Sequence, residues 1–193
     1  MEKIGAFIFR NRSYMPIPVL LVGIFWPAYN VSSMGLNMTL GIIFVVLGEL
    51  GRIWCVSYAG GITRTRKGDL NQLITSGPFS FVRNPIYISN IIMYSASAFL
   101  LGVPVLVPFA IIYFTLEYTF IIAYEELLLI KTFGDEYIQY TDNVRRWLPR
   151  LTPYVGRNVH YPLVKEALKA ERSTFNSIMG IVAVAIIKYF LLR

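Results

Sequence analysis

Long apolar runs are the feature that most constrains what this chain can fold into. Several of them approach the roughly 20 consecutive apolar residues that an α-helix needs to cross a bilayer. The chain has 193 residues, of which 55% are hydrophobic, a share that is uncommon in soluble domains. Inside lipid every backbone polar group must be satisfied within the segment, which favours helices. The sequence therefore predicts an all-α integral membrane protein.

The apolar runs divide the chain into about five expected transmembrane helices, which leave no room for a second domain. These spans cover residues 17–31, 38–58, 85–101, 105–130 and 175–192. Before the last span, apolar residues fall on one helical face after Pro162, and we expect an interfacial helix over 163–171. We therefore interpret residues 1–193 as a single transmembrane domain whose loops and interfacial helix form a pocket.

Basic residues set the expected orientation. Lys and Arg outnumber Asp and Glu by 18 to 11, and they gather in the N-terminal segment and in the segments 60–84 and 131–172. The links 32–37 and 102–104 carry no charge. Because Lys and Arg are retained on the cytoplasmic side, we expect the N-terminus inside and the C-terminus outside. Anionic lipid headgroups, rather than nucleic acid, explain the net charge of +7.

Cysteine and histidine are scarce. The chain has one of each, Cys55 and His160, which excludes an internal disulfide and argues against a zinc site built from these residue types. We expect no metal site.

The segment 71–87 is a polar loop, marked by glycine and proline, that ends where an apolar run begins. Asn84 has a side chain suited to capping a helix, and Pro85 suits the first helical position. The residue before a proline is pushed out of helical geometry, which again places Asn84 at the cap. The loop thus presents Arg83 and a helix N-terminus, a combination that binds anions.

Two adjacent acids, Glu125 and Glu126, lie near the C-terminal end of the fourth expected span. Acids there oppose the helix dipole and lie near apolar surroundings, so a cation must be close. The protein candidates are Arg83, Arg145 and Arg146. The third and fourth spans form a hairpin, which brings the start of one close to the end of the other.

Together the two features suit a zwitterionic amino-acid ligand, with Phe79, Phe81, Tyr87 and Tyr124 available to pack an adenine. Taken singly, each has a simpler explanation: solvated interfacial acids, or a helix cap with an orienting arginine. Glu49 and Arg52, three residues apart in the second span, share a face and can pair. They form either a structural ion pair or a wall of the same chamber.

Several short motifs resemble the isoprenylcysteine carboxyl methyltransferase family. They are NQLITSGPFSFVRNPIY at 71–87, EEL at 125–127, FGDEY at 133–137, Tyr140, and LP at 148–149. The related phospholipid N-methyltransferases share an Arg-His-Pro and a Glu-Glu element. The resemblance covers residues 72–150 with its spacing preserved.

The resemblance implies a membrane methyltransferase that uses S-adenosylmethionine and releases S-adenosylhomocysteine. Its partners would be membrane lipids and a lipophilic acceptor, such as the carboxylate of a prenylated cysteine, at the cytoplasmic face. By matching positions, the cofactor contacts would be Arg64, Asn71, Gln72, Leu73, Ile74, Phe79, Asn84, Pro85, Ile86, Tyr87 and Glu125. As catalytic residues we predict Arg83, which holds an anion, and Glu126, which accepts a proton if the acceptor is an amine; Glu49 is the alternative base.

Two positions depart from the family pattern and leave the acceptor open. Asn84 replaces the histidine of Arg-His-Pro, and Ile121 stands where the prenylcysteine enzymes have an arginine that serves the substrate. A phospholipid or amine N-methyltransferase is therefore the first alternative. A sterol-reductase-like enzyme, or a transporter that uses Glu49, Arg52 and Glu117 along a path, are further alternatives.

Overall fold

The computed structural model describes residues 2–27, 33–60, 72–156 and 160–191. Within these ranges the regular elements are all helical, as the sequence predicts. The elements in chain order are α1 (Glu2–Asn11), α2 (Pro16–Phe25), α3 (Met34–Ala59), the 3-10 helix η3 (Gly77–Ser80), α4 (Pro85–Leu100), the 3-10 helix η4 (Pro104–Leu106), α5 (Val107–Phe133), α6 (Asp135–Asn143), α7 (Val164–Ala170) and α8 (Arg172–Leu191).

Three helical segments in the described part of the chain are long and apolar enough to cross a membrane. They are α3, the continuous η4–α5 segment Pro104–Phe133, and α8. The apolar helices α2 and α4 have 10 and 16 residues. At about 1.5 Å per residue, α4 is roughly 24 Å long, short of the ~30 Å hydrocarbon core. The prediction of an integral membrane helical protein is confirmed, while the number of five spans remains a prediction.

The first predicted span differs most from the structure. It was expected over 17–31, but α2 ends at Phe25, and residues 28–32 lie outside the described part. Trp26 has extended backbone angles, φ −69° and ψ 133°. It precedes Pro27, whose ring disfavours helical geometry in the residue before it. That proline therefore explains why the helix stops early.

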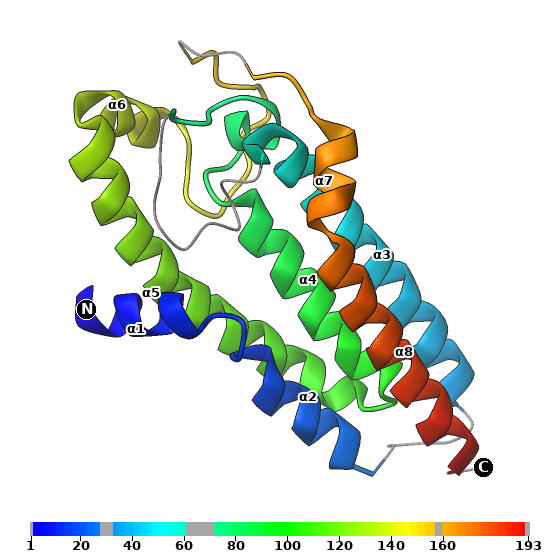
Figure 1. Cartoon of the computed structure of the whole chain (residues 1–193). Coiled ribbons are helices and arrows are strands. Elements are labelled where there is room, and N and C mark those ends of the chain that lie inside the picture. Colours follow the sequence, from blue (N-terminus) through cyan, green and yellow to red (C-terminus); the bar gives the residue numbers. More distant parts are fainter. Residues whose placement is uncertain (1, 28–32, 61–71, 157–159, 192–193) are drawn as a thin grey trace.

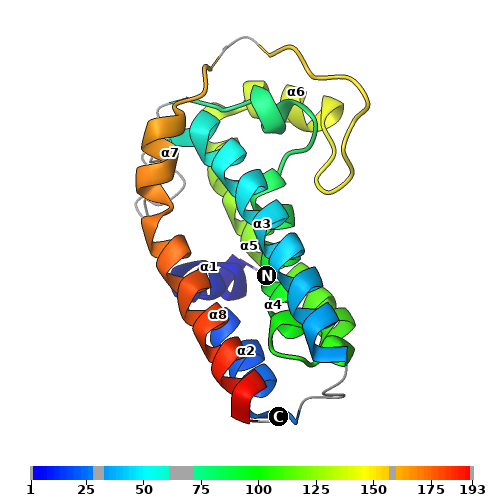
Figure 2. The same ribbon diagram turned by 90° about the vertical axis from the view of Figure 1, so that its right-hand side faces the viewer.

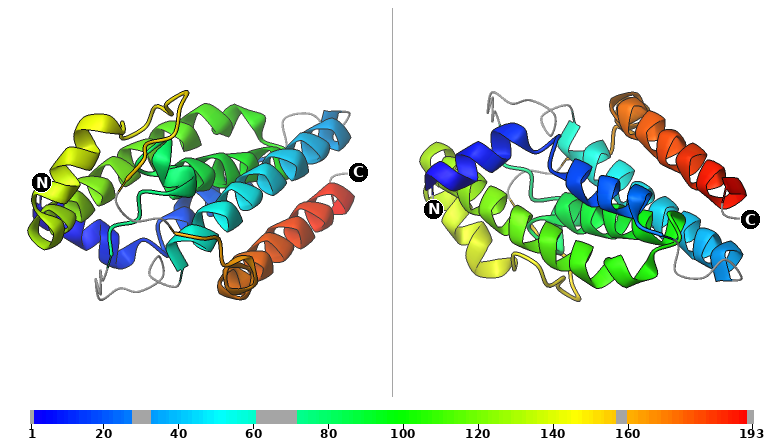
Figure 3. Two further views of the ribbon diagram at one scale, coloured as in Figure 1. Left: turned by 90° about the horizontal axis from the view of Figure 1, so that it is seen from above. Right: turned by 90° about the horizontal axis from the view of Figure 1, so that it is seen from below.

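The helices form an elongated bundle in which α3, α4 and α5 make the central group (Figure 1). Helices α2, α4 and α8 run in one direction along the bundle, and α3 and α5 run in the other. Viewed from the side, from above and from below, α8 lies outside the central group (Figures 2 and 3). In α8 the buried residue is Ala185, whereas α3 and α4 each contain ten buried residues. The outer position of α8 therefore leaves its inner face available to line a cavity.

Small residues allow α3 and α4 to approach closely. A methyl group added at Gly41 would lie 2.7 Å from the backbone nitrogen of Leu100, and one at Gly48 would lie 2.9 Å from the carbonyl oxygen of Ser89. Close backbone approach through glycine is a common way for helices to associate in membranes. This packing fixes α3 against the helix that carries the Asn84–Tyr87 segment.

The N-terminal helix α1 has no counterpart in the sequence-based prediction. It lies across α5 (Figure 1), and a methyl group added at Gly5 would lie 2.7 Å from the carbonyl oxygen of Phe120. Its side chains Ile4 and Phe7 are exposed, and Arg10 lies in its last turn. Such an amphipathic helix is typical of a membrane interface.

The loop that precedes α4 is held by the segment that follows α6. The backbone N–H of Arg83 donates to the carbonyl oxygen of Arg145 at 3.0 Å, and that of Arg150 donates to Phe81 at 2.8 Å. The Tyr140 hydroxyl donates to the carbonyl oxygen of Phe79 at 2.7 Å. Burial raises the pKa of the Tyr140 phenol, which therefore stays a hydrogen-bond donor. These hydrogen bonds hold the loop against the segment that follows α6.

We predict that Gly48→Leu destabilises the bundle, because the larger side chain meets Met93 and the backbone of Ser89. Overpacking of this kind costs about 1–3 kcal/mol. The matched control is Gly35→Leu on the same helix, where an added methyl group meets nothing within 4 Å. Thermal unfolding in detergent measures both, and equal stability of the two variants would contradict the close α3–α4 packing.

Candidate functional site

The start of α4 and the final turns of α5 meet at the same end of the bundle. The Tyr87 hydroxyl donates a hydrogen bond of 2.7 Å to Oε2 of Glu125, and the Tyr87 side chain is buried. The helical hairpin predicted from the sequence thus brings these two segments into direct contact. The hydrogen bond also fixes the direction of the Glu125 carboxylate.

Asn84 occupies the N-cap position of α4, but the predicted side-chain cap is wrong. Its side chain makes no cap hydrogen bond; Nδ2 instead donates to the carbonyl oxygen of Arg146 at 3.3 Å. Pro85 is the first helical residue, as expected, and the Asn84 carbonyl accepts the Tyr87 N–H at 3.2 Å. The asparagine therefore ties the helix start to the segment after α6.

Glu126 lies between two of the three arginines that the sequence suggested. Its Oε1 is 3.5 Å from Nη2 of Arg83, and its Oε2 is hydrogen-bonded to Nη2 of Arg146. Arg145 is exposed and contributes its carbonyl oxygen to the loop contact. Glu126 is not among the cavity-lining residues. Both carboxylate oxygens of Glu126 are thus engaged by guanidinium groups. We predicted Glu126 as a proton acceptor in the cavity, but its side chain is not part of the cavity wall.

Glu125 is paired with a residue that the sequence reasoning did not single out. Nη1 of Arg12 lies 3.7 Å from Oε1 of Glu125. The guanidinium carbon also lies 4.5 Å from the ring centroid of Phe9. Arg12 directly follows α1, so no motif near Glu125 in the sequence indicates it.

A cavity of about 990 Å³ opens beside these residues. This is near the upper end of the ~300–1,000 Å³ that ligand pockets occupy. The predicted site residues that line it are Gln72, Leu73, Ile74, Phe79, Arg83, Asn84, Ile86, Tyr87, Tyr124 and Glu125. Pro85, Phe81 and Glu126 are not among its lining residues. Arg64 and Asn71 lie outside the described residues.

Further aromatic side chains line the loop end of the cavity. Tyr137 and Tyr140 on α6 join Phe79 there. With Leu73 and Val144, the two tyrosines form a buried cluster between α6 and the loop. The sequence analysis identified both tyrosines as parts of the family-like motifs but did not place them in the cavity wall.

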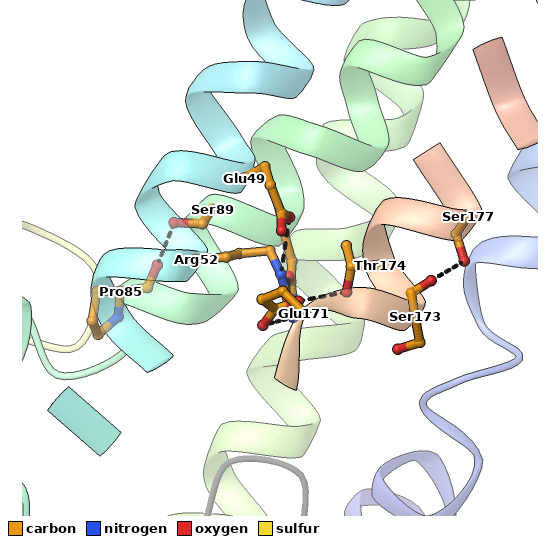
Figure 4. Close-up of polar contacts among 9 residues, drawn as sticks. Glu49, Arg52, Pro85, Ser89, Glu171, Ser173, Thr174 and Ser177 are labelled. Atoms are coloured by element: carbon orange, nitrogen blue, oxygen red, sulfur yellow. Dashed lines mark hydrogen bonds and ion pairs between the residues drawn. The ribbon is translucent and has the colours of Figure 1, made fainter. Parts of the chain in front are cut away.

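A second polar cluster surrounds Arg52 (Figure 4), which also lines the cavity. The predicted pair is confirmed, since Nε of Arg52 lies 3.6 Å from Oε2 of Glu49. Nη2 of Arg52 donates to both carboxylate oxygens of Glu171, at 2.9 and 3.0 Å, and Nη1 is hydrogen-bonded to Asn90. The Thr174 hydroxyl donates to Glu171 at 2.5 Å.

Glu171 is fully buried at the junction of α7 and α8. The sequence reasoning placed it only at the end of an interfacial helix, because its partner is 119 positions away in the chain. The cluster fastens the start of α8 to α3 and α4.

The suggested transport path does not follow the cavity. Of Glu49, Arg52 and Glu117, the cavity lining includes Arg52 but neither acid. Glu117 is buried on α5, and its carboxylate has no hydrogen-bond partner among the described residues.

Comparison with known proteins adds a family and several relatives. The phospholipid methyltransferase family matches residues 36–136. The chain is 35% identical over 126 residues to the cobalt-zinc-cadmium resistance protein CzcN of Cupriavidus metallidurans, a match covering 64% of this chain and 54% of that protein. No solved structure matches the chain significantly.

Mammalian relatives carry the name protein-S-isoprenylcysteine O-methyltransferase. The Mus musculus protein is 29% identical over 140 residues, which cover 69% of this chain and 48% of that protein. The Homo sapiens protein is 30% identical over 136 residues, which cover 67% and 46%. The chain thus spans about half the length of the curated relatives it matches.

Among its described residues, no group of three or more His, Cys, Asp or Glu side chains is placed to hold a metal ion.

We predict that Glu171→Gln destabilises the protein, because it leaves the buried Arg52 charge with a weaker partner. Breaking a buried ion pair on one side costs about 3 kcal/mol or more. Glu166→Gln on α7 is the control, since Glu166 is exposed and such surface changes stay within about 0.5 kcal/mol. Denaturant unfolding in detergent tests this, and equal midpoints for both variants would show that the cluster does not hold α8.

Proposed function

The chain belongs to the phospholipid methyltransferase family, and on that premise we propose that it is an S-adenosylmethionine-dependent methyltransferase acting on a lipophilic acceptor. The observation that carries this proposal is the Glu125 carboxylate, fixed by Tyr87 at the wall of a cavity that Arg83 also lines. The two charges suit the ammonium and the carboxylate of one zwitterionic ligand.

The donor's amino-acid end fits the charged residues of the wall. Glu125 would hold the ammonium through a charge-assisted hydrogen bond. Arg83 would hold the carboxylate: its Nε is buried and has no hydrogen-bond partner among the described residues. A buried donor without a partner is costly, which supports a ligand at this point. Phe79, Tyr137 and Tyr140 would pack the adenine at the loop end.

The bound donor supplies a methyl group already activated on a sulfonium sulfur, so the protein's task is alignment and exclusion of water. A carboxylate acceptor needs no base, whereas an ammonium must first lose a proton. Glu125 is the acid that lines the cavity among the described residues, whereas Arg12, Arg52 and Arg83 are lining cations. Because Arg52 and Arg83 are paired with acids behind the wall, the names of the mammalian relatives, rather than net charge, favour a carboxylate acceptor and O-methylation.

Amine N-methylation is the second candidate, because the matching family is that of the phospholipid methyltransferases. The two outcomes differ in the product. A methyl ester formed from labelled donor is released by mild base, whereas an N-methyl group is stable to it.

The smaller cavity beside the main one could bind the acceptor's apolar chain. A smaller cavity of about 230 Å³ lies between α2 and α8. It shares Leu20, Ser177 and Ile181 with the main cavity. We propose that the chain enters here from the lipid phase and that the polar end reaches the donor. The site would face the cytoplasm, as the distribution of basic residues predicts.

We predict that Glu125→Gln raises the Kd for S-adenosylhomocysteine by at least about 30-fold. Losing one partner of a desolvated charge pair costs roughly 2 kcal/mol or more. Asp142→Asn, an exposed change on α6, is the control. Equilibrium binding to the detergent-purified protein measures both. Wild-type affinity in Glu125→Gln would refute the donor site, and binding of a nicotinamide nucleotide instead would favour a reductase.

We predict that Gly180→Leu fills the smaller cavity. This change should weaken binding of the acceptor without affecting binding of the donor. Gly180 lines this cavity, and a methyl group added there meets nothing within 4 Å. Displacing about two methylene groups costs roughly 1.6 kcal/mol, so KM for N-acetyl-S-farnesylcysteine should rise about tenfold. Gly35→Leu is the control. An unchanged KM together with unchanged S-adenosylhomocysteine binding would place the chain elsewhere.

A further inference from the structure

A lysine joins α2 and α8 at the end of the smaller cavity that lies away from the donor site. Nζ of Lys188 donates to the carbonyl oxygens of Gly23 and Trp26, both at 2.7 Å. We propose that this contact, here named the Lys188 clip, sets an upper limit on the length of the acceptor's apolar chain. The inference rests on the proposed function and assigns a specificity residue to the same site.

The clip follows from the way α2 ends. The last carbonyl oxygens of a helix have no partners within that helix, and a cation near them also interacts favourably with the helix dipole. Lys188 lies in the last turn of α8, and its flexible stem reaches across to α2. Both helices lie outside residues 36–136, which the family comparison covers. The clip is therefore a feature of this chain's own terminal segments.

The clip lies directly beyond the residues that close the smaller cavity. Val184 and Ile24 line that cavity. Lys188 is one turn beyond Val184 on the same face of α8, and Gly23 directly precedes Ile24. Leu101 also lines the cavity, and a methyl group added at Gly23 would lie 2.8 Å from Cδ1 of Leu101. A chain that fills the smaller cavity therefore ends against Leu101 and the clip.

The side of α8 that faces the cavities changes from polar to apolar toward the clip. Ser173, Thr174 and Ser177 line the main cavity near the start of the helix, and Ile181 and Val184 follow toward its end. A lipid with a polar head and an apolar chain matches this order, because the chain leaves water for an apolar wall. The continuity of the two cavities thus supports a lipid chain as the occupant.

The length of this wall gives the expected limit. From Ser173 to Val184, α8 rises about 16 Å at roughly 1.5 Å per residue. An extended chain advances about 1.2 Å per bond, so about 13 bonds fit along this side of α8. A farnesyl chain is shorter than this limit, and a geranylgeranyl chain is longer.

A chain that exceeds the limit must displace Lys188 from the two carbonyl oxygens. The ammonium and the end of α2 would then lose their hydrogen bonds in apolar surroundings, which is costly. Hydrogen bonds to charged groups are strong enough that affinity should fall at least about tenfold. If Lys188 only supported the fold, its replacement would affect chains of every length equally.

The experiment measures binding of two series of single-chain probes to the intact chain in detergent, with saturating S-adenosylhomocysteine. N-acetyl-S-alkylcysteines carry a carboxylate head, and lysophosphatidylethanolamines carry a phosphate head. Affinities are expressed against the probe concentration in the micelle, which removes the effect of partitioning. For at least one series, we expect nearly constant affinity in the wild type up to about 13 bonds. Beyond that length the affinity should fall at least about tenfold.

Three variants test the role of the clip in this profile. Lys188→Ala should move the limit to longer chains by about one helical turn, or about four bonds. Lys188→Arg retains a cationic donor and should keep a limit near that of the wild type. Val184→Phe narrows the end of the cavity and should move the limit to shorter chains. Lys169→Ala, an exposed change on α7, is the control and should leave the profile unchanged.

Several outcomes would overturn the inference. They are the same limit in Lys188→Ala as in the wild type, no limit in the wild type, and an equal loss of affinity for all chain lengths in Lys188→Ala. If Lys188→Ala does not fold, an unchanged limit in Val184→Phe overturns it. So does binding of neither series to a protein that still binds S-adenosylhomocysteine. Absence of S-adenosylhomocysteine binding in the wild type refutes the proposed function itself, which separates the two failures.

Discussion

The hydrogen bond from Tyr87 to Glu125 is the contact on which the account of the site depends. It joins the first turn of α4 to the last third of α5 at 2.7 Å, and it orients a carboxylate in surroundings where an unpaired acid is costly. Next to it, Arg83 and Arg146 engage Glu126. The two adjacent acids thus differ in role. Glu126 links the loop before α4 to the segment after α6, whereas Glu125 lines the cavity.

A second constraint is that polar contacts hold α8 near both of its ends. At its start, Glu171 binds Arg52. Near its end, Nζ of Lys188 donates to the carbonyl oxygens of Gly23 and Trp26, both at 2.7 Å. Between these points Ser177 and Ile181 line both cavities. Polar contacts at both ends, together with the packing of Val182 and Ala185 on the core, therefore keep α8 in place beside the two cavities.

Much of the architecture could be predicted from local patterns. Apolar length located α3, α4, α5 and α8 to within a few residues, and the hairpin correctly placed the start of α4 beside Glu125. The pairing of Glu126 with two arginines followed from the cost of unpaired acids.

Contacts between distant segments could not be predicted. Arg12 and Glu171 depend on how α1 and α8 dock, which no local pattern encodes, and α1 is too short to be evident as an apolar run. The Asn84 cap failed because Arg146, brought in by the loop after α6, offered a competing acceptor.

The most direct measurement is an experimental structure of the protein with S-adenosylhomocysteine bound. The account predicts the ligand's amino nitrogen within hydrogen-bond distance of Glu125 and its carboxylate at Arg83. Ligand density elsewhere, or a ligand whose amino nitrogen makes no contact with Glu125, would contradict it.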